Sequence, residues 1–307
     1  PGGHAGKRGE YEGALTVDPC RDEGNEQGRY SRLSNAALIW LVFSSGVAVM
    51  GLEMSASRLI APYFGSTLSV WTSLIGLVMI FLTGGYYLGG ALADRYTSRG
   101  LLGGVVLAAG LITIFVPMIS KPVLESAWGL TPKAGLLGAS LVGTFALFSL
   151  PMILLGCVCP FALKLSIHDL RRTGRTSGHI YAVSALGSVV GTFLPALIMI
   201  DRWGVRRSIM AFGLLLILAG VVFLRRARYV PAVAAALLLL VPLPPMLSAQ
   251  GIIAREESSY NYLQVAEAGD MRVLVVDWGA FSVYQPNRFR THQYFDYLLL
   301  APLLRAE

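Results

Sequence analysis

The sequence is poor in charged residues and in cysteine. Charged residues account for 14% of the 307 positions, whereas hydrophobic residues account for 54%. A soluble globular domain has about 25% charged residues, so this composition excludes an ordinary soluble domain. The high hydrophobic content also excludes a disordered chain, and three cysteines are too few for a disulfide-stabilised scaffold.

The residues that are abundant point to a membrane. The chain contains 34 glycines and 15 prolines, which are more frequent in membrane helices than in soluble ones. We therefore expect a multi-pass membrane protein with the lipid bilayer as its partner. The net charge of +7 is expected to set orientation and to contact lipid head groups, and nucleic acid is not an expected partner.

Both ends suggest a part of a longer protein. Residue 1 is proline instead of methionine, and residues 1–34 are polar and glycine-rich without an apolar stretch. We predict a disordered N-terminal segment there. The last residues, Ala301 to Glu307, form no closing element, so we expect the chain to be a fragment.

Seven apolar stretches reach the roughly 20 residues that a helix needs to cross a bilayer. They predict an α-helical polytopic membrane bundle over 35–250, with spans near 36–57, 68–92, 101–120, 135–163, 179–200, 208–224 and 230–249. Pro151 and Pro160 predict a kink in the fourth stretch. The segments between these spans that share the N-terminus's side of the membrane hold about twice as many lysines and arginines as those on the other side. This asymmetry predicts a protein of the cell membrane whose N-terminus is cytoplasmic. The segment from Asp201 to Arg207 is the exception.

Glycines four residues apart predict where helix backbones approach closely. Gly85 with Gly89 and Gly187 with Gly191 have this spacing, and so does the series Gly135, Ala139 and Gly143. Glycine-rich spans also produce this spacing by chance. Homo-oligomer formation through such a stripe stays open.

Glu53 is an acidic residue inside the first apolar stretch, and Arg58 follows five positions later. An ionised side chain in the membrane needs a partner or a water-filled surrounding. Two interpretations follow. Glu53 forms a local ion pair with Arg58 and a contact with Ser57, which we favour, or it belongs to a substrate or proton site.

Cys157 and Cys159 lie in the fourth apolar stretch. A metal site needs further ligands, and no second cysteine pair is present in the sequence. We therefore expect two buried thiols and no metal site.

The pattern changes after Gln250. Alternation around Tyr260 to Ala266, and the apolar run from Arg272 to Asp277, predict two strands joined by a turn at Gly269-Asp270. A third short strand is predicted over Phe281 to Tyr284, and a helix over 291–304. Residues 251–307 are thus predicted to form a small β subdomain after the bundle.

Several blocks resemble one family, the multi-pass membrane proteins that are similar to spermidine synthase. In the membrane region the matching blocks are Gly51-Leu52-Glu53-Met54, Arg58 to Gly65, Val70-Trp71-Thr72 and Gly178 to Ala182. In the tail they are Glu257 to Val265, Arg272 to Asp277, Ser282-Val283-Tyr284 and Tyr294 to Tyr297. The turn from Gly90 to Arg95 also resembles the loop signature of major facilitator transporters, which implies a major-facilitator-like bundle.

The resemblance implies an aminopropyltransferase that acts in polyamine metabolism. Such an enzyme moves an aminopropyl group from decarboxylated S-adenosylmethionine, its co-substrate, to putrescine. The tail would be the N-terminal β subdomain of that domain, and the nucleoside-binding half with its catalytic residues is expected beyond residue 307. No cofactor is expected to bind this chain itself, and the chain alone is expected to be inactive.

The resemblance assigns substrate binding to Asn261, Tyr294 and Asp296. The pattern departs from the soluble enzymes in both motifs: Tyr260-Asn261 replaces a Tyr-Gln pair, and Tyr294-Phe295-Asp296, which retains the tyrosine, replaces Tyr-His-Glu. Asparagine has the same donors and acceptor as glutamine on a shorter side chain, but phenylalanine cannot replace an imidazole.

Two alternatives stay open. The chain is a transporter-like protein that handles polyamines, or it is a structural membrane module without catalysis. A conflict in topology also remains, because seven spans with a cytoplasmic N-terminus place the tail outside, whereas S-adenosylmethionine chemistry is expected in the cytoplasm.

Overall fold

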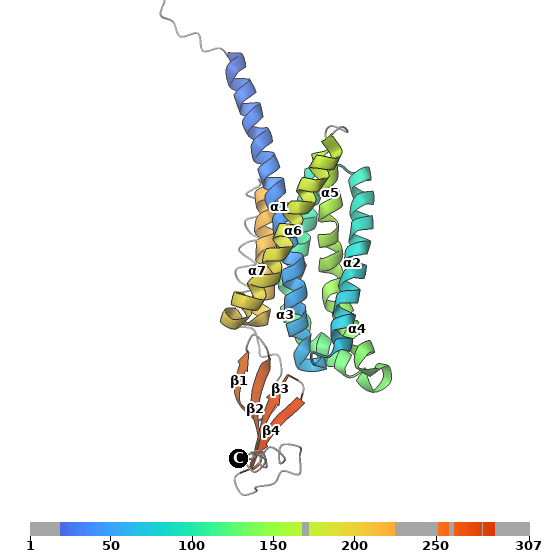
Figure 1. Ribbon diagram of the computed structural model, residues 1–307, viewed down its shortest axis with the longest axis vertical. Coiled ribbons are helices and arrows are strands. Elements are labelled where there is room, and N and C mark those ends of the chain that lie inside the picture. The colour runs from blue at the N-terminus through green and yellow to red at the C-terminus, as the bar shows by residue number, and fades with distance from the viewer. Residues whose placement is uncertain (1–18, 168–171, 225–250, 258–260, 278, 286–307) are drawn as a thin grey trace, which may run out of the picture. The chain divides into compact units, whose positions relative to one another are not determined.

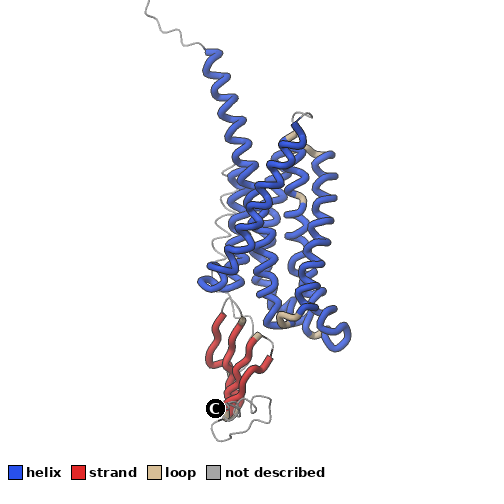
Figure 2. The backbone as a smooth tube through the Cα atoms, viewed as in Figure 1, coloured by secondary structure: helices blue, strands red, loops and turns tan. Residues whose placement is uncertain are grey.

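The computed structural model describes residues 19–167, 172–224, 251–257, 261–277 and 279–285. Within these residues it has five helices that are long and apolar enough to cross a membrane, and one antiparallel sheet of four strands (Figures 1 and 2). The predicted class, membrane helices followed by a small β subdomain, is therefore confirmed. The predicted count of seven spans and the major-facilitator-like arrangement are not.

The first three helices coincide with predicted spans. Helix α1 covers Pro19–Phe64, and its apolar part is Asn35–Phe64. Helix α2 covers Leu68–Arg95 and helix α3 covers Arg99–Trp128. Helix α1 begins inside the segment predicted to be disordered, where arginine, glutamate and glutamine residues with good helix propensity precede the apolar run.

The fourth apolar helical region, Thr131–Ser166, is broken near its end, as the prolines predicted. Helix α4 covers Thr131–Gly156 and helix α5 covers Val158–Ser166. Pro160 has no backbone N–H to donate to the carbonyl of Gly156, four residues earlier, and this explains the interruption at Cys157. Pro151, in contrast, lies inside α4 without ending it.

The fifth region, Thr173–Leu224, holds two of the predicted spans in one stretch of 52 residues. It consists of α6 (Thr173–Leu194), the π-helical turn η2 (Pro195–Met199) and α7 (Ile200–Leu224). A straight helix of this length would be about 78 Å long, more than twice the ~30 Å apolar core of a bilayer. Gly204 breaks it with φ 78° and ψ 166°, a conformation that only glycine adopts readily. The predicted seventh span, 230–249, lies outside the described residues.

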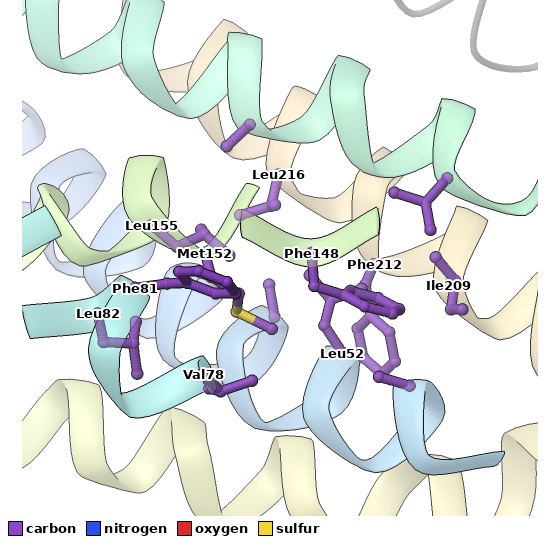
Figure 3. Packing of buried hydrophobic residues seen from close by; sticks show 14 of the residues in the cluster. Leu52, Val78, Phe81, Leu82, Phe148, Met152, Leu155, Ile209, Phe212 and Leu216 are labelled. Atoms are coloured by element: carbon purple, nitrogen blue, oxygen red, sulfur yellow. The ribbon is translucent and has the colours of Figure 1, made fainter. Parts of the chain in front are cut away.

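Side chains from α1, α2, α4 and α7 interlock in the core of the bundle. Figure 3 shows Leu52 of α1 beside Phe212 of α7, with Phe148 and Met152 of α4 nearby. Leu52, Phe148, Met152 and Phe212 are all at most 2% exposed. The hydrophobic core of this region is thus continuous across helices that are distant in sequence.

Four of the predicted glycines mark close helix approaches. A Cβ added at Gly89 of α2 would lie 2.5 Å from the Cα of Cys157, and one at Gly85 would overlap the carbonyl of Ile153. Added Cβ atoms at Gly187 and Gly191 of α6 would overlap carbonyls of α1. These predictions are confirmed.

The third glycine series is only partly a packing stripe. A Cβ at Gly143 would come to 3.1 Å from the Leu124 side chain. Gly135 was wrongly predicted to pack against a helix, because it has open space around it and turns the chain with φ 68° at the start of α4.

The sheet has the order β1-β2-β3-β4 and consists of β1 (Ile252–Glu257), β2 (Tyr262–Ala268), β3 (Met271–Val276) and β4 (Gly279–Tyr284). Strands β2, β3 and β4 confirm the predicted ones, and Gly269, with φ 63°, confirms the turn. Strand β1 was not predicted. The predicted helix at 291–304 lies outside the described residues.

Candidate functional site

The sheet and the helical bundle each contain a group of buried polar residues, and we describe each group by itself. In the sheet, the group is centred on Asp277, which directly follows β3. The register pairs Leu263 with Val276, so the next step along the two strands brings the start of β2 opposite Asp277. Asp277 has φ 53° and is 6% exposed.

The Asp277 carboxylate joins the two strands through both of its oxygens. Oδ2 accepts a hydrogen bond of 2.8 Å from the side-chain amide of Asn261, and Oδ1 accepts one of 2.9 Å from the backbone N–H of Tyr262. The Asp277 N–H in turn donates to the Tyr262 carbonyl at 2.8 Å. The predicted binding residue Asn261 therefore has its amide directed at a buried carboxylate. Tyr294 and Asp296 lie outside the described residues.

Gln264 adds a second buried polar group to this sheet. It is two residues beyond Tyr262, so both side chains lie on the same face of β2. Gln264 is 5% exposed, and its Nε2 finds no hydrogen-bond partner. The sequence analysis assigned no role to Gln264 or Asp277. Asp277 could have been noticed as an acidic residue at the end of an apolar strand, whereas nothing in the alternation distinguishes Gln264 from a solvent-facing residue.

The chemistry of this corner suits a protonated amine. Each carboxylate oxygen has two lone pairs, and each is engaged here by one donor, so the Asp277 carboxylate keeps acceptor capacity. A positively charged donor would also offset the cost of burying the carboxylate charge.

In the bundle, the predicted ion pair between Glu53 and Arg58 is wrong. Glu53 is 4% exposed, and no salt bridge joins it to Arg58 among the described residues. Residues five positions apart are separated by about 140° around a helix, so the two side chains leave α1 in different directions. The Ser57 hydroxyl does not donate a hydrogen bond to Glu53 either, because it donates to the carbonyl of Met54 at 2.7 Å.

Arg206 is a buried cation that the sequence analysis missed. It belongs to the segment 201–207 that disagreed with the charge rule, and it is 8% exposed. Its Nε donates to the carbonyl of Pro117 in α3 at 3.1 Å, and its terminal nitrogen donates to the same oxygen. The disagreement of this segment with the charge rule could have indicated a buried cation, since Arg206 points into the protein and anchors the start of α7 on α3.

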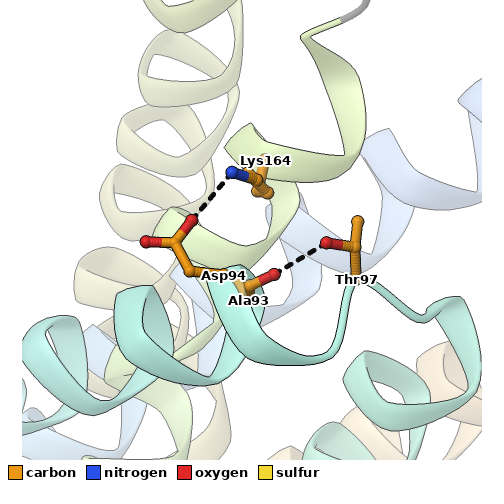
Figure 4. Close-up of polar contacts among 4 residues, drawn as sticks. All are labelled: Ala93, Asp94, Thr97 and Lys164. Carbon is orange, nitrogen blue, oxygen red and sulfur yellow. Dashed lines mark hydrogen bonds and ion pairs between the residues drawn. The ribbon is translucent and has the colours of Figure 1, made fainter.

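The end of α2 is joined to α5 by a surface ion pair (Figure 4). Lys164 of α5 lies 2.7 Å from the carboxylate of Asp94 in α2, and both side chains are at least half exposed. The Thr97 hydroxyl donates to the Ala93 carbonyl at 2.8 Å and helps to end α2. An exposed pair of this kind contributes at most about 1 kcal/mol, so its main effect is to tie α5 to the end of α2.

Cys157 and Cys159 are free thiols, and the prediction that both are buried is confirmed only for Cys157. Cys157 is buried and Cys159 is partly exposed, with its sulfur 3.4 Å from the Ser184 hydroxyl. Across the described residues, no three histidine, cysteine or acidic side chains are grouped in a way that would hold a metal ion.

Comparison with known proteins found no matching family model, no matching curated protein and no matching solved structure. The functional argument therefore depends on the residues and their geometry.

Proposed function

We propose that the chain is a membrane-anchored protein of polyamine metabolism, and that its sheet belongs to an aminopropyltransferase-like domain. The observation that supports this proposal best is the buried Asp277 carboxylate bound by Asn261, since this corner joins the two strands that resemble the family. The co-substrate under this proposal is decarboxylated S-adenosylmethionine, and the second substrate is putrescine.

The proposed chemistry explains why a carboxylate and an amide are needed. In aminopropyl transfer, an amine nitrogen attacks the carbon next to a sulfonium centre, and the sulfide leaves. The remote ammonium group of the diamine must be held so that the attacking nitrogen is correctly placed. In our proposal Asp277 binds that ammonium group and Asn261 orients the carboxylate, while Tyr294 and Asp296 are the further substrate contacts.

A binding measurement on the full chain in lipid nanodiscs tests the proposal. The Asp277→Asn substitution removes the charge but retains a residue that tolerates positive φ. We expect isothermal titration calorimetry to show putrescine binding to the unmodified chain, weakened by about 1.5–3 kcal/mol in this variant because a charged hydrogen bond is lost.

Glu267→Gln is the matched control. Glu267 is an exposed acidic residue of the same sheet that pairs with Arg272 at 3.3 Å. Its substitution should leave the putrescine affinity unchanged. Equal affinity of Asp277→Asn and the unmodified chain would contradict the proposal, and so would an equal loss in both variants, which would indicate only general charge attraction.

We also propose that the chain lies in the cell membrane with its N-terminus in the cytoplasm. The first four apolar helices cross once each, and the fifth crosses twice because it is broken at Gly204, which makes six crossings. An even number returns the chain at Leu224 to the N-terminal side. If 230–249 does not cross, the sheet then lies in the cytoplasm, where the co-substrate is expected.

A further inference from the structure

Glu53 differs from every other acidic residue in the described parts of the five apolar helices. Asp94, Glu125 and Asp201 are all exposed, whereas Glu53 is 4% exposed. Neither a hydrogen bond nor a salt bridge to its carboxylate is found in the part of the chain that the structure describes. A buried carboxylate without a partner is costly, so residues of this kind generally mark a function.

The packing of α1 shows which neighbour Glu53 faces. Gly46 lies against Ser184 and Ser188 of α6, and the Ser188 hydroxyl is 3.4 Å from the Gly46 carbonyl. Glu53 is seven residues beyond Gly46, two helical turns, and therefore lies within about 20° of the same face. Gly51, on the other side of α1, packs on the ring of Phe212.

The level of Glu53 along α6 follows from the same contacts. Gly187 meets the carbonyl of Phe43 and Gly191 meets that of Val47, so the two helices run parallel in a constant register. Extending that register brings Glu53 level with the π-helical turn η2, Pro195–Met199. Pro195 has no N–H for the carbonyl of Gly191, which explains the local change in winding, and π-turns inside helices are frequent at functional sites.

We propose that Glu53 and the η2 turn form a binding site for an alkylammonium ion inside the bundle. The carboxylate takes the charged nitrogen, and Pro195 and Met199, the two buried residues of η2, accommodate the alkyl chain. A Ca²⁺ or Mg²⁺ ion would need six or more oxygen ligands, and Glu53 is the only buried acidic residue among the helical residues whose burial is described. A single carboxylate in apolar surroundings instead matches a monovalent organic cation.

The depth of Glu53 indicates a free amine instead of a lipid head group. Glu53 lies eleven residues before Phe64, the end of the apolar part of α1, which corresponds to about 16 Å along the helix axis. That distance is half the apolar thickness of a bilayer, so an ethanolamine head group at the membrane surface does not reach it. This site is separate from the sheet corner at Asp277 and goes beyond the function proposed above.

Carbodiimide labelling of the full chain in phosphatidylcholine nanodiscs tests the site. Dicyclohexylcarbodiimide modifies carboxyl groups in apolar surroundings, and mass spectrometry of peptides gives the labelling rate of Glu53. We expect hexylammonium at ten times its Kd to slow this rate about elevenfold, because one-site occupancy protects by 1 + [L]/Kd. Hexanol, which has the same alkyl chain without the charge, should leave the rate unchanged.

Three comparisons make the result decisive. Any labelling of the exposed carboxyl of Glu125 should show no protection by hexylammonium. Glu53→Gln should bind no hexylammonium, and Glu53→Asp, which retains the charge, should bind it more weakly. Equal protection by hexanol, or no protection by hexylammonium, overturns the proposal. Protection that appears only when phosphatidylethanolamine is present would contradict the proposal that the ligand is a free amine and would indicate a lipid head group. None of these outcomes depends on Asp277, so the sheet proposal can succeed or fail independently.

Discussion

At the scale of single residues, Arg206 and Glu53 are both buried in the helical bundle but differ in how the protein accommodates them. The Arg206 guanidinium donates to the carbonyl of Pro117, a backbone group in an apolar helix. The Glu53 carboxylate has no such bond among the described residues. This contrast gives Arg206 a structural role and is the reason why we propose a binding role for Glu53.

The structural role of Arg206 predicts a loss of stability on its removal. Arg206→Ala removes the guanidinium donors from the buried Pro117 carbonyl, which keeps the Ser120 hydroxyl as a donor at 2.9 Å. We expect a loss of about 1.5–3 kcal/mol, the range for a hydrogen bond that involves a charged group. Thermal unfolding in detergent, followed by circular dichroism, measures it. The adjacent Arg207 is exposed, and Arg207→Ala should have little effect. Equal losses in both variants would show that the effect is not specific to the buried guanidinium.

At the scale of elements, apolar length and proline position were sufficient to predict most of the helices. The break before α5 follows from Pro160, and the spans of α2 and α3 follow from continuous apolar runs. The predicted separation of the spans 179–200 and 208–224 agrees with the turn at Gly204, but the sequence did not single out this glycine, because it does not show which of 34 glycines adopts positive φ. Strand β1 was missed because Ile252–Glu257 ends in charged residues, which obscure the alternation.

The contact between α2 and the α4–α5 junction gives a prediction with a matched control. Gly89 meets the backbone of Cys157, whereas its neighbour Gly90 has open space around it. Gly89→Ala should destabilise the protein by about 1–3 kcal/mol through overpacking. Gly90→Ala should be neutral or stabilising by up to about 1 kcal/mol, since alanine favours helix. Thermal unfolding in detergent compares the two. Destabilisation of the same size at Gly90 would mean that helix flexibility, and not the close contact, is what matters.

At the scale of the whole molecule, composition alone predicted the class of protein but not how its polar residues are used. Low charge and long apolar runs required membrane helices, and the five long helices agree. The hydrogen bonds of Asp277 depend on strand register, and the isolation of Glu53 depends on which direction Arg58 leaves α1. Neither can be read from residue type, because both are set by three-dimensional packing between elements.

The side of the membrane on which the sheet lies is also a property of the whole molecule. We expect a single cysteine introduced by Ser258→Cys, in a chain with Cys20, Cys157 and Cys159 replaced, to react with an impermeant maleimide only from the cytoplasmic side. This result follows from the proposed topology, in which the N-terminus is cytoplasmic, the chain crosses an even number of times up to Leu224 and 230–249 does not cross. A chain that retains only Cys20 reports the N-terminal side directly and serves as the orientation control. Labelling at the two positions from opposite sides would show that 230–249 crosses the membrane, and it would separate the sheet from the cytoplasmic supply of S-adenosylmethionine derivatives that the proposed transfer reaction requires.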